Sequence, residues 1–166
     1  VILAWLFQQY LRIICSVTRT YSLSGEWHSH SVRIYYEDTD AQGIVYFANY
    51  QRFMERGRTE WLRNYGITQE ALHRKHGLFF SLVSTAVKYT KPALLDQQVV
   101  VMTRVKEIRG IRIVFAQEVR LDTAAGELLT SAECVAVCID ASTLKARRLP
   151  DTLKQVLNVA QSGSNS

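Results

Sequence analysis

The amino-acid sequence predicts a single α+β domain in which a five-stranded antiparallel sheet curls around one long helix. The order of segments favours this fold class, because one strand-type and one long helical segment are followed by four strand-type segments in a row. The chain has 166 residues, of which 48% are hydrophobic, and this suits one domain with a substantial core.

The first strand is predicted over residues 30–36. Val32, Ile34 and Tyr36 fall on one face of this segment, as the period of two in a strand requires. The next segment, EDTDAQG at 37–43, is rich in turn-forming residues and predicts a loop.

The long helix is predicted from about Ala48 to Gly66, and a second, short helix over 68–77. Large apolar side chains recur at helical spacing in the long helix: Tyr50, Phe53, Met54, Trp61 and Tyr65. Gly57 lies in the same stripe, although glycine costs about 1 kcal/mol of helix propensity. We therefore expect Gly57 to permit a close contact of the helix backbone. A helix of about five turns with one apolar stripe needs a sheet to cover it.

Four strand-type segments follow, at 79–92, 97–108, 110–122 and 126–140. Turn signals separate them at Lys91-Pro92, Gly110 and Ala125-Gly126. A final helix is predicted to begin near Pro150-Asp151. Such a sheet leaves an open edge and a partly apolar face, so we expect a homodimer or homotetramer.

The two ends of the chain differ in composition from the rest. Residues 1–27 are expected to form an extension that is not part of the fold, residues 28–158 the domain, and residues 159–166 a disordered tail. The apolar run at the start has no basic segment before it, and Gln8, Gln9 and Arg12 interrupt it. It is therefore a poor signal peptide and too polar to span a bilayer. A weak amphipathic helix lying on a membrane or on the domain stays open as the alternative.

Charge and cysteine content limit the function classes. The net charge of +5 favours anionic partners. The basic residues are scattered over strands without a nucleic-acid-binding motif, so we expect no nucleic-acid partner. Cys134 and Cys138 would lie about 13 Å apart on one strand, too far for a disulfide or a shared metal. With Cys15 they give an odd count, typical of free thiols in a reducing, cytoplasmic compartment. No histidine pair has metal-ligand spacing, so no metal or cofactor is predicted.

The candidate site lies in YYEDTDAQGIVYFANY, residues 35–50, where two aspartates precede an aromatic run and a helix start. Backbone N–H groups at a helix N-terminus can polarise a carbonyl, and a nearby carboxylate can attack it or activate water. Capping of the helix by Asp38 or Asp40 is the structural alternative, although Asp40 lies several residues ahead of the first turn. The motifs of α/β serine hydrolases, phosphate-binding loops and dinucleotide-binding folds do not occur in the chain.

The same segment resembles the signature of the hotdog-fold acyl-CoA thioesterases. The similar residues are Y-x-D-T-D-A-x-G-x-V-Y from Tyr36, the following Asn49-Tyr50, and E-R-x-R-T-E-W-L-R from Glu55. The similarity continues to about Leu157 and is closest to the hydroxybenzoyl-CoA thioesterase-like family, which includes the bacterial Tol-Pal-associated thioesterases. The resemblance implies a hotdog fold, hydrolysis of acyl-CoA to a free acid and coenzyme A, no cofactor, and active sites at a dimer interface.

The resemblance also implies roles for individual residues. Asp40 would be the nucleophile or the general base, and the backbone N–H of Phe47 would polarise the thioester carbonyl. Gly43 would bend the loop, and Tyr36 would line the site. The Tol-Pal branch usually carries histidine at position 47 and the hydroxybenzoyl branch tyrosine. Phenylalanine keeps the backbone N–H but cannot shuttle a proton.

The remaining candidates concern the substrate. Ile44 and Val45, with Phe47, could hold an acyl chain. Arg109 and Arg112 flank Gly110 in a predicted hairpin, where they could bind the phosphates of coenzyme A. Acyl carrier protein is an alternative carrier of the substrate.

Two other functions stay open. One is a non-catalytic acyl-CoA or acyl-carrier binding or scaffold protein, held at a membrane by residues 1–26. The other is a hotdog dehydratase, which needs a histidine working with a carboxylate on or beside the central helix. Glu55 and Glu60 lie on the predicted helix, but no histidine does, which counts against the dehydratase.

Overall fold

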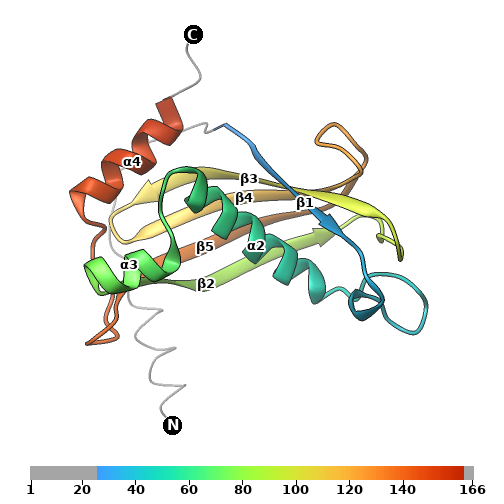
Figure 1. The fold of residues 1–166 in the computed structure, drawn as a ribbon, viewed down its shortest axis with the longest axis horizontal. Helices are drawn as coiled ribbons and strands as arrows, with labels where there is room; N and C mark the ends of the chain where they lie inside the picture. The colour runs from blue at the N-terminus through green and yellow to red at the C-terminus, as the bar shows by residue number, and fades with distance from the viewer. Residues whose placement is uncertain (1–25, 163–166) are drawn as a thin grey trace.

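The sheet has five antiparallel strands in the order β1-β3-β4-β5-β2. The computed structural model describes residues 26–162. The strands are β1 His28–Arg33, β2 Leu78–Tyr89, β3 Gln98–Arg109, β4 Arg112–Leu121 and β5 Leu128–Asp140. Figure 1 shows α2 lying along one face of this sheet. The predicted α+β class, and the sheet around one long helix, are confirmed.

Three helices and one short 3-10 turn complete the described chain: α2 Asn49–Asn64, α3 Gln69–His76, α4 Asp151–Ser162 and the turn Tyr36–Asp38. Thr68 caps α3, because its hydroxyl accepts the Ala71 N–H at 3.1 Å. Gly77 ends α3 with a φ of 61°, the left-handed conformation that favours glycine. All three helices begin within a residue or two of the positions predicted from the sequence.

The core divides into two clusters along α2. Near the start of the helix, Tyr50, Phe53 and Met54 pack with Val32 and other buried residues of β1, β3, β4 and β5. Near its end, Trp61 and Leu62 pack against the sheet together with the apolar side chains of α4. Both clusters lie on the same face of the sheet, so α2 is the central support of the domain.

Gly57 lies between these clusters, where the helix approaches β3 closely. A Cβ atom at Gly57 would stand 2.7 Å from Val101 Cγ1 and 2.8 Å from the Thr103 hydroxyl oxygen. These separations are shorter than carbon contacts in proteins, so only glycine fits without a local shift. The expectation of a close contact at Gly57 is confirmed.

Several predicted boundaries differ from the structure; β2, for example, ends at Tyr89 and not at residue 92. The first strand ends at Arg33 and not at residue 36, because the Asp38 carboxylate accepts the Tyr35 N–H at 3.0 Å and closes a 3-10 turn. Tyr36 therefore lies in this turn and not on a strand. At the other end, α4 is helical to Ser162, so its last turn occupies part of the segment expected to be a disordered tail.

The outer strands of the sheet are β1 and β2. Strand β2 pairs only with β5 among the described strands, and its outer edge carries no third strand. Leu82 on β2 is 43% exposed, which is high for a large apolar side chain in a sheet. This edge is available for pairing with another chain.

Two further expectations concern thiols and membranes. Cys134 and Cys138 are buried free thiols, as predicted, and burial raises the pKa of Cys138 to about 11. None of the helices in the described range 26–162 is long and apolar enough to cross a membrane. Cys15 and the suggested membrane contact of residues 1–26 fall outside the described residues, apart from Glu26.

Candidate active site

The segment between the 3-10 turn and α2 folds as a tight loop. Thr39 and Val45 pair as a short antiparallel bridge. Inside this bridge the Asp40 N–H donates to the Ile44 carbonyl at 2.9 Å, and the Gly43 N–H donates to the Asp40 carbonyl at 3.0 Å. Gly43 has a φ of 75°, a conformation that residues with a Cβ rarely adopt. The loop therefore holds Asp40 in a defined position.

The two aspartates of the motif differ in burial and in hydrogen bonding. Asp38 is buried, and its backbone carbonyl accepts the Asn49 side-chain amide and the Tyr46 N–H, each at 2.9 Å. These bonds, with the carboxylate contact to Tyr35, tie the loop to the first residue of α2. Asp40 is half-buried, and one of its oxygens accepts the Gln42 N–H at 2.9 Å. Its other oxygen accepts no hydrogen bond from any residue between 26 and 162.

Neither aspartate caps α2. The N-cap residue is Ala48, and no side-chain hydrogen bond caps this helix end. The structural alternative, capping by Asp38 or Asp40, is therefore wrong. The Asn49 N–H donates to the Tyr46 carbonyl at 2.8 Å and the Gln51 N–H to the Ala48 carbonyl at 3.1 Å. The positive end of the helix dipole therefore faces the loop, although these two N–H groups are already used.

Phe47 stands two residues before α2. Its N–H donates to no other group in the described part of the chain, while its carbonyl accepts the Tyr89 hydroxyl at 3.1 Å. The Phe47 ring is 59% exposed and lies 4.6 Å from the Tyr46 ring and 6.4 Å from the Tyr89 ring, centroid to centroid. An unbonded amide thus sits beside an exposed aromatic cluster.

The other residues predicted for this site are spread over different environments. Tyr36 is 83% exposed, and no described residue packs its ring into a pocket. Ile44 is half-buried and bridges to Leu94, whereas Val45 is buried in the core and bonds to the Ala93 carbonyl at 2.9 Å. Ile44 is thus the aliphatic side chain of this loop nearest to the surface.

Arg109 and Arg112 lie far from Asp40 in the same protomer. We name residues 39–48, between the 3-10 turn and α2, the Asp40 loop. This loop contacts the segment that leads into β3, whereas the two arginines close the β3–β4 hairpin at the other end of that strand. Twelve residues of strand span about 35–40 Å, so the two regions occupy opposite ends of the sheet (Figure 1). Arg109 forms an ion pair with Glu107 at 2.8 Å.

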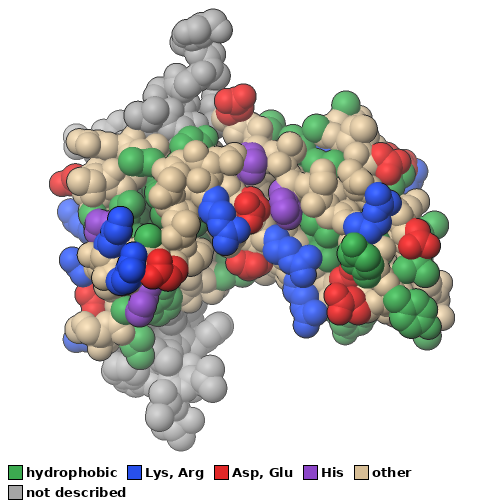
Figure 2. Space-filling model, viewed as in Figure 1, with side chains coloured by type: hydrophobic (Ala, Val, Ile, Leu, Met, Phe, Trp, Pro, Cys, Tyr) green, Lys and Arg blue, Asp and Glu red, His purple; other side chains and the backbone are tan. Residues whose placement is uncertain are grey.

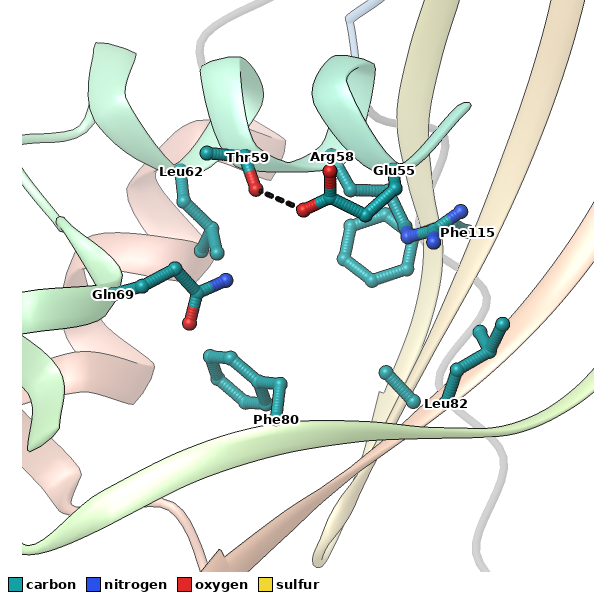
Figure 3. Close-up of a pocket in the computed structure, with 9 residues that line it drawn as sticks. Glu55, Arg58, Thr59, Leu62, Gln69, Phe80, Leu82 and Phe115 are labelled. Carbon is teal, nitrogen blue, oxygen red and sulfur yellow. Dashed lines mark hydrogen bonds between the residues drawn. The ribbon is translucent and has the colours of Figure 1, made fainter. Parts of the chain in front are cut away.

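A cavity of about 130 Å³ lies between α2 and the sheet (Figure 3). Its wall consists of Glu55, Arg58, Thr59, Leu62, Gln69, Phe80, Leu82, Phe115 and Ala136. The Thr59 hydroxyl donates to the Glu55 carboxylate at 2.8 Å. Sequence reasoning did not predict this cavity. The available signal was a second stripe on the helix, since Glu55, Arg58, Thr59 and Leu62 are spaced by three and four residues.

Arg58 joins the cavity wall to a buried polar network. Its Nη1 donates to the Gln117 side-chain oxygen at 2.7 Å, and Gln117 Nε2 donates to the Met54 carbonyl at 2.9 Å and to the Thr103 hydroxyl at 2.8 Å. Burial lowers the pKa of Arg58, although nearby Cys134 and Glu55 oppose this effect. The guanidinium remains charged, because arginine does not deprotonate in proteins. The network therefore fixes α2 to β3 and β4 beside the cavity.

The chain matches a known family. Residues 34–157 match the family described as the thioesterase-like superfamily. The chain belongs to the thioesterase-like superfamily. The acyl-CoA thioester hydrolase YbgC of Escherichia coli O6:H1 is 42% identical over 122 residues, which cover 74% of this chain and 89% of that protein. The acyl-CoA thioesterase YbgC of Haemophilus influenzae is 39% identical over 126 residues, covering 76% of this chain and 90% of that protein.

A solved structure agrees with this assignment to the thioesterase-like superfamily. The probable thioesterase from Bartonella henselae is 31% identical, with a TM-score of 0.70, and the alignment covers 75% of this chain and all of that one. The matched span 34–157 contains the Asp40 loop, all of α2 and every residue that lines the cavity. The site therefore belongs to the part of the chain that the superfamily shares.

Proposed function

We propose that this thioesterase hydrolyses acyl-CoA at the Asp40 loop, converting the thioester and water into a free acid and coenzyme A. One observation carries the placement of the site: one Asp40 carboxylate oxygen and the Phe47 N–H form no hydrogen bond with residues 26–162, and both belong to the loop that leads into α2. Acyl-CoA is the substrate named for the curated relatives, and the hydrolase function follows from family membership.

The geometry supports a division of roles. The thioester carbonyl oxygen would accept the Phe47 N–H, and the dipole of α2 would stabilise the negative charge that develops on this oxygen. Asp40 would attack the carbonyl carbon or take a proton from the attacking water. In either case coenzyme A leaves as a thiolate. Where Asp40 attacks, water then hydrolyses the acyl–Asp40 anhydride, which releases the free acid and restores the carboxylate. A backbone N–H does not depend on the side chain, so phenylalanine at position 47 keeps this contact.

The acyl group would pass the exposed rings of Phe47, Tyr46 and Tyr89 and the side chain of Ile44. The far end of the acyl group could enter the cavity beside α2. Glu55 in the cavity wall lies about 9 Å along the helix axis from Asn49, the first residue of α2. A cavity of about 150 Å³ holds a benzene ring, so the 130 Å³ space here suits a group of similar size.

In this proposal, binding of the coenzyme A part of the substrate requires a second copy of the chain. In one protomer Arg109 and Arg112 are at the far end of the sheet from Asp40. A homodimer with antiparallel protomers, paired through the open edge of β2, would bring the partner subunit's Arg109 and Arg112 toward the Asp40 loop. Acyl carrier protein, delivering the same thioester, is the alternative donor. Free thiols at Cys134 and Cys138 support a reducing compartment such as the cytoplasm.

The test is free-thiol release from a panel of acyl-CoAs by the wild-type chain and by Asp40→Asn. We expect Asp40→Asn to lose turnover by at least two to three orders of magnitude while folding normally, since an amide is neither a base nor a nucleophile. Asp122→Asn is the matched control, because Asp122 is exposed and has a φ of 59°, which asparagine tolerates. Near-normal turnover of Asp40→Asn would remove Asp40 from the mechanism.

The same experiment separates the alternatives. Saturable acyl-CoA binding without thiol release by the wild-type chain would indicate a binding or scaffold protein. A dehydratase remains disfavoured, because α2 carries no histidine between Asn49 and Asn64.

A further inference from the structure

The loop between β5 and α4 presents an exposed leucine. Leu144 is 58% exposed and has a φ of 55°. This left-handed conformation is rare for a residue with a branched, bulky side chain, and glycine or asparagine usually occupies it. The chain therefore holds a large apolar side chain in water at a strained position.

The loop that carries Leu144 is firmly held. One oxygen of Asp140 accepts the backbone N–H groups of Ser142 and Thr143, each at 3.0 Å, and the Ser142 hydroxyl at 2.6 Å. The Leu144 N–H donates to the Asp140 carbonyl at 2.9 Å, and the Ala141 N–H donates to the Gly77 carbonyl at 2.8 Å. The last bond ties the loop to the end of α3, so Leu144 projects from a fixed turn.

Cationic residues follow this leucine in the chain. Lys145, Arg147 and Arg148 follow it directly and are exposed. The end of α3, His73–His76, contributes Arg74, Lys75 and two histidines, and Arg147 Nη1 approaches the His76 carbonyl at 3.5 Å. We name residues 73–76 and 142–148 the α3–loop surface. Figure 1 places both segments at the same end of the sheet, and Figure 2 shows basic and histidine side chains gathered over α3.

The acidic groups of the α3–loop surface do not cancel its charge. Asp140 pairs with Arg147 at 3.1 Å, and Glu70 pairs with Arg74 at 3.3 Å. Lys75, Lys145 and Arg148 form no ion pair with any described residue. The surface therefore combines free positive charge with one projecting apolar side chain.

We propose that the α3–loop surface binds the face of an anionic lipid bilayer. Lysine and arginine side chains would contact lipid phosphates, and Leu144 would enter the boundary between headgroups and acyl chains. An acidic protein would form ion pairs with the same cations, but such a partner would not explain why a leucine projects alone from a rigid turn. Within one protomer the Asp40 loop lies at the opposite end of the sheet from the α3–loop surface. This proposal does not depend on the proposed function.

The experiment is co-sedimentation of the full chain with phosphatidylcholine vesicles, with and without one-third phosphatidylglycerol. We expect binding only to the anionic vesicles. Replacing Lys145 and Arg148 together by glutamine should lower the partition coefficient about 30-fold, roughly fivefold for each cation, which corresponds to about 1 kcal/mol per Lys or Arg near such a surface. Leu144→Gly should lower it about tenfold without loss of thermal stability, since glycine relieves the strained φ. Lys88→Gln, an exposed and unpaired lysine of β2, is the matched control and should bind as the wild type does.

Three outcomes would overturn the proposal. The first is absence of wild-type binding to anionic vesicles. The second is unchanged binding of the Lys145/Arg148 double variant, which would assign membrane contact to another part of the chain, such as residues 1–25. The third is unchanged binding of Leu144→Gly, since a purely electrostatic surface would suit an acidic protein equally well. Thiol release by each variant, measured in parallel, would show that folding and the Asp40 site are intact.

Discussion

Asp38 and Asp40 illustrate how differently two residues of one motif can act. They are separated by one threonine, and the sequence pattern alone left both as candidates for catalysis or capping. The structure buries Asp38 and uses its carboxylate and carbonyl to build the loop, whereas one Asp40 oxygen accepts no hydrogen bond from residues 26–162. Resemblance to a family predicted the role of Asp40, but composition and spacing did not.

Gly57 permits a stability prediction at the same scale. We expect Gly57→Ala to destabilise the fold by about 1–2 kcal/mol. Overpacking against Val101 and Thr103 costs about 1–3 kcal/mol, and the better helix propensity of alanine offsets up to about 1 kcal/mol of this. Urea unfolding would measure the change. Arg56→Ala on the exposed face of α2 is the control and should stay within about 0.5 kcal/mol of the wild type. A stabilised Gly57→Ala would show that the helix can move away from β3 at no cost.

At the scale of elements, β1 is joined to the end of α2 by a histidine. His28 Nδ1 lies 2.8 Å from the Asn64 side-chain amide, a contact in which the neutral imidazole accepts. Burial lowers the pKa of His28, nearby His30 lowers it further, and Glu60 opposes both effects. The folded state therefore takes up the His28 proton at lower pH than the unfolded state, whose pKa is near 6.5.

This difference predicts a pH-dependent stability. Between the lowered folded pKa and 6.5 the unfolded state binds more protons, so the free energy of unfolding rises with pH and falls as the pH drops below about 6.5. Chemical denaturation at pH 7.5 and 5.5 would measure the decrease. His28→Asn should reduce this decrease, and His73→Asn on exposed α3 should not. An equal pH dependence in His28→Asn and the wild type would contradict the assignment.

The secondary-structure elements themselves were largely predictable. The apolar stripe of α2, the Thr68 cap and Gly77 of α3, and the alternation in β4 are local patterns that act within a few residues. The end of the first strand was predicted three residues too late, because the side chain of Asp38 competes for the backbone N–H of Tyr35. The alternation of hydrophobic residues does not reveal that a side chain will take a backbone N–H away from the hydrogen-bond ladder of a strand.

At the scale of the whole molecule, the open edge of β2 leads to a prediction about assembly. We expect Leu82→Glu to weaken the proposed homodimer at least tenfold, because a charge on an edge strand opposes pairing. Turnover should fall with the dimer, since each site is proposed to need the partner subunit's Arg109 and Arg112. Light scattering after size exclusion, together with thiol release, would test both effects. Thr85→Ser on the same strand is the control.

Two results would contradict that prediction. A Leu82→Glu dimer as tight as the wild type would move the interface away from β2. A Leu82→Glu monomer with full turnover would show that one protomer holds a complete site.

The sequence by itself determined the order and type of the elements, the buried stripe of α2 and the segment that contains the candidate site. These features depend on apolar residues that recur every two residues in a strand and every three to four residues in a helix. A short stretch of sequence is enough to reveal such a pattern. The tertiary structure alone decided the contacts between distant segments. Arg58 meets Gln117 across 59 positions of the chain, and Arg109 and Arg112 lie at the end of the sheet opposite Asp40. The reason is physical: strand order and register place residues in space, and both follow from packing of the whole domain against α2 and not from any local pattern.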